Sequence, residues 1–180
     1  MHSLIEAANG HRYGVIYVDP PWRFKTWSER GMGRSPSYRT MILPGLIALP
    51  VDEIAADNCV LAMWHISTHV RDAMYLAEAW GFRKFIPDGF IWVKTTREGL
   101  PRMGLGYHTR RSAELCALAF RGNPRRQDRG VPQVLMAPRG EHSTKPAEIR
   151  NRLRRLYSGP YFEMFARQRV PGWAAWGDEI

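Results

Sequence analysis

The residues most suggestive of chemistry are Asp19-Pro20-Pro21-Trp22, which follow the apolar run 15–18. Asp19 supplies a carboxylate acceptor, and Pro20 supplies a backbone carbonyl that the fixed φ of each proline holds stiffly. Trp22 supplies an indole that can stack on a flat base. Two acceptors directed at both hydrogens of an aryl amine would pull its nitrogen toward a nucleophilic form, since acceptors placed where positive charge develops stabilise the reacting state. The motif therefore predicts methylation of an exocyclic amine such as that of adenine.

A buried strand must position these residues. The stretch 13–22 (YGVIYVDPPW) begins with β-branched and aromatic residues and carries no charge before Asp19, as is typical of a parallel strand covered on both faces. Two prolines end the strand, because neither can donate to a ladder. Open α/β sheets hold their ligands at the carboxyl ends of such strands. In the alternative interpretation, Asp19 caps a helix and Trp22 belongs to the core.

Composition favours a polyanionic partner. The chain has 180 residues, 44% of them hydrophobic, which predicts one domain over 1–180. A net charge of +9 and a pI of about 10.1 favour nucleic acid. No apolar run is long enough to span a membrane, and no secretory signal is visible, so we expect a cytoplasmic protein. Cys59 and Cys116 lie in apolar runs without metal-ligand spacing, so we expect buried thiols and no metal.

The order of expected elements predicts an α/β fold. Apolar runs predict strands at 59–64, 89–93, 114–121, 131–136 and 161–167. Helices are expected at 50–56, at 67–80 with Ser67 as cap and Val70, Met74, Ala77 and Trp80 on one face, and at 145–157. Alternation of strands and helices indicates a mostly parallel sheet.

Basic residues gather in the expected loops. The loop 23–40 interleaves five cations with aromatic residues, and 95–111 and 122–130 are also loop-like. The loop 23–40 suits phosphates and bases and 122–130 suits phosphates, or both are solvated surface. In the helix 145–157, helical spacing predicts that Ile149, Leu153, Leu156 and Tyr157 face the sheet. We expect Arg150, Arg154 and Arg155 to form a mainly solvated face. Glu163 lies in an apolar run and needs a partner, for which Arg167 is the candidate if the pair is purely structural.

An ordered series of motifs resembles the MT-A70 family, the DPPW-type adenine N6-methyltransferases. DPPW at 19–22 is followed by YRTM at 38–41, WVKT at 92–95 and ELCALAFRGNP at 114–124. HSTKP at 142–146, LYSGPYFEMFAR at 156–167, and GW with WGDE within 172–179 complete the series. The resemblance covers nearly the whole chain. It implies a Rossmann-like fold with helices on both faces, in which the catalytic motif precedes the strand that binds S-adenosylmethionine.

The resemblance also implies roles for individual residues. Asp19 and Pro20 would hold the target amine, Pro21 would shape the loop, and Trp22 and Tyr38 would line the base pocket. The cofactor would be bound by Lys145, Glu163, Arg167, Asp178 and Glu179. His108 and Glu114 would flank the target nucleotide. Lys145 would meet the carboxylate of the cofactor, although an ordinary lysine at a helix start is the alternative.

Two departures from the family pattern bear on function. Asp178 stands where the family usually has Asn, and the chain lacks the zinc-binding and partner domains of eukaryotic members. We expect an adenine N6-methyltransferase that acts on DNA in a bacterial or phage-infected cell, and the family allows a homodimer. The same reaction on RNA, a non-catalytic nucleic-acid-binding subunit, and methylation of a small molecule or protein amine are the alternatives.

Overall fold

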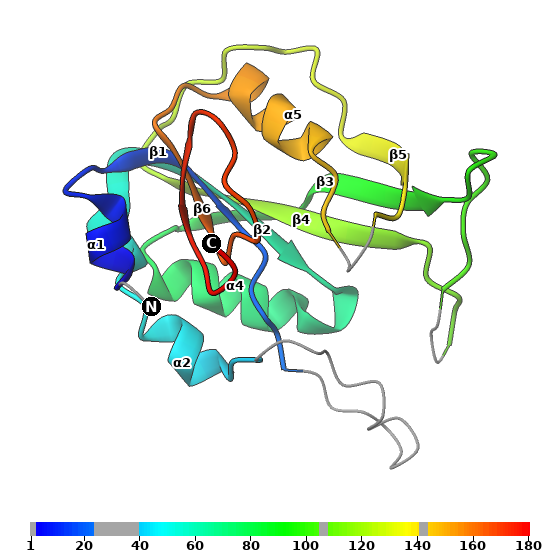
Figure 1. Cartoon of the computed structure of the whole chain (residues 1–180), viewed down its shortest axis with the longest axis horizontal. Coiled ribbons are helices and arrows are strands. Elements are labelled where there is room, and N and C mark those ends of the chain that lie inside the picture. Colours follow the sequence, from blue (N-terminus) through cyan, green and yellow to red (C-terminus); the bar gives the residue numbers. More distant parts are fainter. Residues whose placement is uncertain (1–2, 24–39, 105–107, 141–143) are drawn as a thin grey trace.

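Residues 3–23, 40–104, 108–140 and 144–180 are described by a computed structural model (Figure 1). The strands are β1 (Tyr13–Val18), β2 (Ala55–His65), β3 (Lys84–Thr95), β4 (Ala113–Arg121), β5 (Val134–Pro138), β6 (Tyr161–Met164) and β7 (Trp173–Trp176). The helices are α1 (Leu4–Ala8), α2 (Leu43–Ile47), α3 (Val51–Ile54), α4 (Val70–Ala79) and α5 (Glu148–Leu156), with a 3₁₀ turn at Ser67–His69.

The strands form one seven-stranded sheet in the order β5-β3-β4-β2-β1-β6-β7. Four of the six strand pairings are parallel, and the two antiparallel pairings are those of β4 with β2 and with β3. The prediction of a mostly parallel α/β sheet is confirmed. The motif strand β1 lies near the middle and pairs with β2 on one side and β6 on the other.

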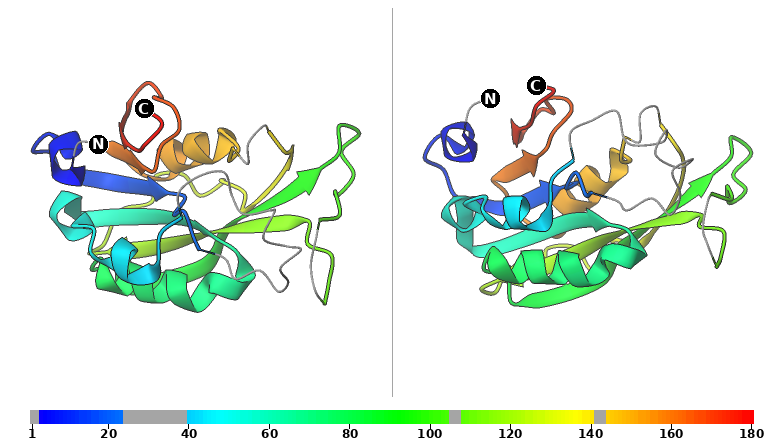
Figure 2. Two further views of the ribbon diagram at one scale, coloured as in Figure 1. Left: turned by 60° about the horizontal axis from the view of Figure 1, so that its bottom comes forward. Right: turned by 90° about the horizontal axis from the view of Figure 1, so that it is seen from below.

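Helices cover both faces of the sheet, as Figure 2 shows for α4 and α5. Alternate residues of β1 enter different cores: Ile16 and Val18 pack toward α1 to α4, and Val15 and Tyr17 pack toward α5. All four side chains are at most 1% exposed. This uninterrupted burial explains the charge-free apolar run, since a strand covered on both faces has no solvent side.

Several elements differ from the sequence-based expectation. The short elements α1, α2 and β7 were not expected. Ser67 does not cap α4, which begins after a 3₁₀ turn with His69 at the N-cap and no side-chain cap bond. The buried face of α4 is Ala73, Leu76 and Ala77, whereas Met74 is 43% exposed. The expected stripe was therefore wrong at Met74.

The helix α5 buries two arginines: Arg150, which we expected in solvent, and Arg152, to which we assigned no environment. Ile149, Leu153 and Leu156 face the sheet as predicted. Arg150 and Arg152 are only 7% and 6% exposed, because the helix lies flat on the sheet and its flanks are covered too. The expectation of a solvated Arg150 was wrong. Arg152 donates to the carbonyls of Pro132 and Val134 at 2.8 and 3.0 Å and so ties the start of β5 to α5.

The cysteines are buried as free thiols, as the sequence predicted for Cys59 and Cys116. No helix among the described residues is long and apolar enough to cross a membrane.

Candidate active site

Three neighbouring parallel strands end together at the site. Val18 of β1 pairs with Met164 of β6, which pairs with Trp176 of β7. Asp19 directly follows the first of these residues. The segments that carry Arg167 and Glu179 continue from the other two strands. Parallel topology therefore brings the motif and the predicted cofactor residues to one edge of the sheet.

The backbone of the motif is fixed by hydrogen bonds. The N–H of Trp22 donates to the carbonyl of Pro20 at 2.7 Å, and the N–H of Met41 donates to the carbonyl of Pro21 at 2.8 Å. A carbonyl oxygen has two lone pairs, so Pro20 keeps one acceptor position after binding Trp22. Rigidity at this turn thus comes from backbone bonds as well as from the proline rings.

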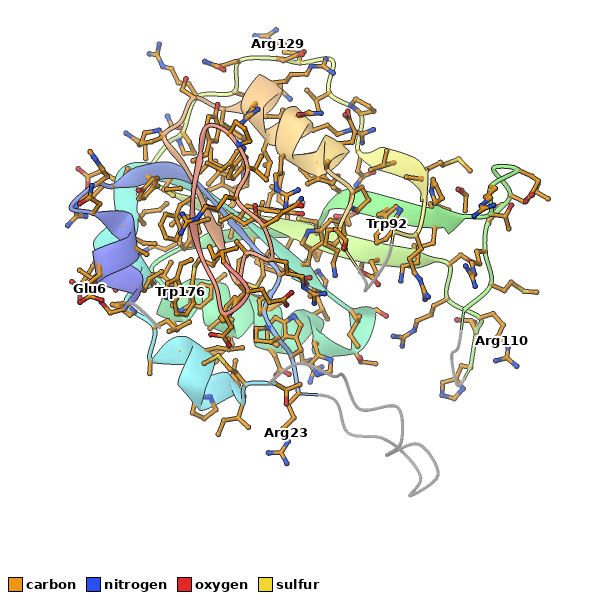
Figure 3. All side chains as sticks on the ribbon, in the orientation of Figure 1. Glu6, Arg23, Trp92, Arg110, Arg129 and Trp176 are labelled. Atoms are coloured by element: carbon orange, nitrogen blue, oxygen red, sulfur yellow. The ribbon has the colours of Figure 1, made fainter. Side chains whose placement is uncertain are left out.

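Trp22 is part of the core in this structure. Its ring is 6% exposed, its Nε1–H donates to the carbonyl of Trp64 at 3.0 Å, and its centroid lies 5.8 Å from that of His69. Contact between this ring and an extruded base stays a prediction. Arg23, the next residue, is exposed and is labelled in Figure 3.

A chain of alternating charges crosses the site. Lys145 Nζ lies 2.8 Å from Asp19 Oδ2 and 3.3 Å from Glu114 Oε2. Lys94 Nζ is bonded to the other oxygen, Oε1, of Glu114. These four residues come from the ends of β1, β3 and β4 and from the segment before α5. Lys145 lies three residues before α5, whereas we expected it inside that helix.

Partial burial strengthens this network. Burial acts to lower the pKa of Lys145, but the charges of Asp19 and Glu114 outweigh it, so the pKa lies above its usual value. Burial acts to raise the pKa of Glu114, but Lys145 and Lys94 outweigh it, so the pKa lies below its usual value. Lys145 is therefore an ammonium and Glu114 a carboxylate at neutral pH. An ammonium has three donors, and among the described residues Lys145 meets the carboxylates of Asp19 and Glu114, so a third donor can serve a further ligand.

The carboxylate of Glu163 is held by Arg150. Arg150 Nε and Nη2 donate to the two oxygens at 2.7 and 2.6 Å, and both side chains are less than 10% exposed. Such bidentate pairs fix the plane of the carboxylate. From the sequence, Arg167 was the candidate partner of Glu163 in a purely structural ion pair, and that prediction was wrong. Arg167 lies 3.6 Å from Glu179, and the pair joins the segments after β6 and β7.

Two cation–π contacts connect Lys145 and Arg150 through one pair of aromatic rings. Lys145 Nζ lies 5.5 Å from the centre of the Trp64 ring, and the Arg150 guanidinium lies 5.3 Å from the centre of the Tyr17 ring. Trp64 Nε1–H donates to the Tyr17 hydroxyl at 2.6 Å. Burial raises the pKa of Tyr17 well above its usual value, so the hydroxyl stays neutral. The two cations thus rest on a rigid aromatic pair.

The remaining predicted residues are exposed or lie outside the described residues. Asp178 is exposed beside Glu179, and His108 is exposed on the connection between β3 and β4. Tyr38 lies outside the described residues. Within the described ranges, no group of three or more His, Cys, Asp or Glu side chains could hold a metal ion.

Sequence reasoning missed Lys94 and Arg150. Lys94 directly follows the apolar run 90–93. Functional residues often lie at the carboxyl end of such a strand. Arg150 follows Ile149 on the flank of the apolar stripe of α5, and an acid inside the run 161–167 required a cation. Both signals were present, but the sequence contained too many arginines to show which one meets Glu163.

Three proteins of known class are similar to the chain. It is 30% identical over 189 residues to the Type II methyltransferase M.MunI of Mycoplasma sp, a match that covers 94% of this chain and 78% of that protein. It is 28% identical to the human N(6)-adenine-specific methyltransferase METTL4, over 93% of this chain and 37% of that protein. It is also 28% identical to the N6-methyladenosine RNA methyltransferase MTA1 of Cryphonectria parasitica, over 97% of this chain and 53% of that protein.

The family model for MT-A70 matches residues 13–179, from the first residue of β1 to Glu179. The match includes Asp19, Glu114, Lys145 and Glu163, which the structure gathers at one edge of the sheet. The chain therefore belongs to the MT-A70 family.

Proposed function

We propose that this protein methylates the exocyclic N6 amine of adenine in DNA, with S-adenosylmethionine as methyl donor. The observation that carries the proposal is the position of Asp19, whose Oδ2 is held by Lys145 at 2.8 Å. We assign the other oxygen, Oδ1, to the target amine, since no hydrogen bond from the described residues occupies it. Pro20 lies next in the chain with one acceptor position left on its carbonyl.

These two acceptors would bind both hydrogens of the adenine amine and free its lone pair from the ring. Lys145, Glu163 and Glu179 would hold S-adenosylmethionine, which would supply a methyl group on a sulfonium whose carbon–sulfur electron pair stays with the departing neutral thioether. The amine nitrogen forms the new bond to carbon, and its surplus proton passes to water. Asp19 and Pro20 thus orient the nucleophile and stabilise the positive charge that develops on it.

The charges at the strand ends fit the methyl donor. Its carboxylate needs a cation, and Lys145 has one donor left beyond Asp19 and Glu114. Its ribose hydroxyls need acceptors, and Glu163 and Glu179 lie at the ends of the neighbouring strands. Bidentate pairing with Arg150 leaves each oxygen of Glu163 a second lone pair. We assign Lys145, Glu163, Arg167 and Glu179 to the cofactor, with Asp178 beside them.

The choice of DNA over RNA is supported by the likeness to the bacterial Type II methyltransferase, which is 30% identical and of which the chain spans 78%. Methylation of RNA is the second candidate because of the fungal RNA methyltransferase, which is 28% identical and of which the chain spans 53%. A non-catalytic role is less consistent with an intact Asp19-Pro20-Pro21-Trp22 motif.

The proposal is tested by incubating the pure protein with methyl-labelled S-adenosylmethionine and separate DNA and RNA mixtures, followed by digestion to nucleosides. We expect labelled N6-methyladenine from DNA. Label in RNA adenine alone would move the proposal to the second candidate. A protein that binds the cofactor in calorimetry but labels no adenine in either polymer would exclude both candidates.

A further inference from the structure

The connection between β3 and β4 projects from the sheet at the same edge as the site (Figure 1). We call its described residues, 96–104 and 108–112, the β3–β4 hairpin. Its backbone is bonded to itself: the N–H of Thr96 donates to Leu100 at 2.8 Å, and the N–H of Gly104 donates to Arg111 at 2.9 Å. Gly99 has a φ of 85°, which favours glycine in the turn. The described part of the hairpin is therefore a defined structure.

Two large apolar side chains of this hairpin are open to solvent. Met103 is 77% exposed and Leu100 is 66% exposed, more than any other large apolar side chain in the described ranges. Single exposed apolar residues are common, but two on one short backbone-bonded segment beside a site indicate a contact surface.

The same hairpin also carries positive charge. The hairpin carries four exposed arginines and one exposed acid, Glu98. The arginines are Arg97, Arg102, Arg110 and Arg111. Arg110 is labelled in Figure 3, where it projects from the hairpin away from the sheet. Guanidinium groups and apolar side chains on one hairpin suit the phosphates and base steps of a nucleic acid better than an apolar protein surface.

The hairpin is attached to the site through Lys94. The carbonyl of Lys94 accepts from the N–H of Arg102 at 2.7 Å, and its N–H donates to the carbonyl of Ser112 at 2.7 Å. The side chain of the same lysine is bonded to Glu114, which lies 3.3 Å from Lys145. Both arms of the hairpin are thus anchored on a residue of the charged network that reaches Asp19.

We propose that the β3–β4 hairpin is the element that unstacks the target base, with Met103 and Leu100 inserting into the duplex and the arginines of the hairpin holding its phosphates. An enzyme that acts on a base amine must extrude that base, and apolar wedges lower the cost of the gap. The inference rests on the proposed function, because it requires a paired adenine as substrate.

The test compares a double variant, L100S/M103S, with a matched control, V134S/M136S. Val134 and Met136 are 46% and 56% exposed on the edge strand β5, so the control also removes two exposed apolar side chains. The target adenine is first located by methylome sequencing. Methylation rates are then measured on that sequence as a duplex and as a single strand. Fluorescence of 2-aminopurine at the target position reports unstacking.

We expect L100S/M103S to lose about 30-fold in rate on the duplex and less than about threefold on the single strand, with the fluorescence rise abolished. V134S/M136S should match the wild type on both. Equal rates of L100S/M103S and wild type on the duplex would overturn the proposal, as would a wild type that methylates only unpaired adenine. L100S/M103S could instead lose rate on both the duplex and the single strand. If light scattering then shows a dimer for the wild type and a monomer for L100S/M103S, the hairpin is a protein contact and the proposal is overturned. A wild type that forms no N6-methyladenine would contradict the proposed function itself.

Discussion

Arg150 and Glu163 form a bidentate ion pair beneath the site, with distances of 2.7 and 2.6 Å between donors and acceptors. The pair links α5 to β6, and Glu163 lies opposite Tyr17 of β1 in the sheet register. The same residues that shape the predicted cofactor edge therefore also hold a helix to the sheet. If Glu163 binds the cofactor as proposed, this pair links ligand binding to stability.

Replacing Arg150 should be strongly destabilising. Arg150→Met leaves a buried carboxylate without its cation, which costs about 3–5 kcal/mol of unfolding free energy. Arg155→Met is the matched control on the same helix, because Arg155 pairs with Asp128 in solvent at 2.6 Å and removal of an exposed pair should change the free energy of unfolding little. Urea unfolding measures both. Adding Glu163→Gln to Arg150→Met should restore part of the loss, and equal effects of the two arginine variants would show that the buried pair does not stabilise the fold.

Glu114 should make stability depend on pH in the acid range. Its pKa is lowered in the folded protein, so its contribution to stability is present above its unfolded value of about 4.3 and is lost as the pH falls through the folded value. The difference in unfolding free energy between wild type and Glu114→Gln should be constant from about pH 7 to 5.5 and should shrink below about 4.3. Glu78→Gln, on the exposed side of α4, controls for the loss of one negative charge. A difference that stays constant down to pH 3 would contradict the network.

The two thiols should be unreactive in the folded protein. Burial raises the pKa of Cys59 to about 12 and raises that of Cys116 as well, so neither is a thiolate at pH 8. Both side chains have no exposed surface. A thiol-reactive dye should label neither residue until the protein is unfolded, after which both should react. Rapid labelling of one thiol under native conditions would show that its side chain is open to solvent.

Binding to nucleic acid should depend on salt through the arginines of the β3–β4 hairpin. If its four exposed arginines each meet one phosphate, the logarithmic salt slope on duplex DNA should be about −3 to −4. Arg110→Gln with Arg111→Gln should reduce the magnitude of this slope by about 2. Arg83→Gln at the opposite edge of the sheet is the control and should leave the slope unchanged. An unaltered slope in the hairpin variant would place the phosphate contacts elsewhere.

Much of the fold follows from the sequence because buried strands have an unmistakable pattern. The runs that form β1, β2 and β4 are apolar enough to predict both their existence and their position. Short elements such as α1 and β7 carry too few residues for periodicity, and they exist because the rest of the fold covers them. The hydrophobic stripe of α5 was predicted, but helical spacing says nothing about how wide a strip of the helix the sheet covers.

The site was predicted less completely than the fold. Asp19, Lys145 and Glu114 meet in the structure, and the ordered motifs had named all three. Lys94 and the pairing of Arg150 with Glu163 depend on contacts between residues far apart in the chain. A list of arginines in one helix cannot indicate which guanidinium turns toward the sheet. Tertiary packing decides that, and only the coordinates show it.

The central claim is that Asp19 orients the amine that accepts the methyl group. It is tested most directly by the methyl-transfer rate of Asp19→Ala, measured together with its affinity for S-adenosylmethionine. The account predicts a loss of at least about 100-fold in rate, because a preorganised acceptor is removed, and an affinity within about tenfold of the wild type. A variant that methylates adenine at nearly the wild-type rate would contradict it.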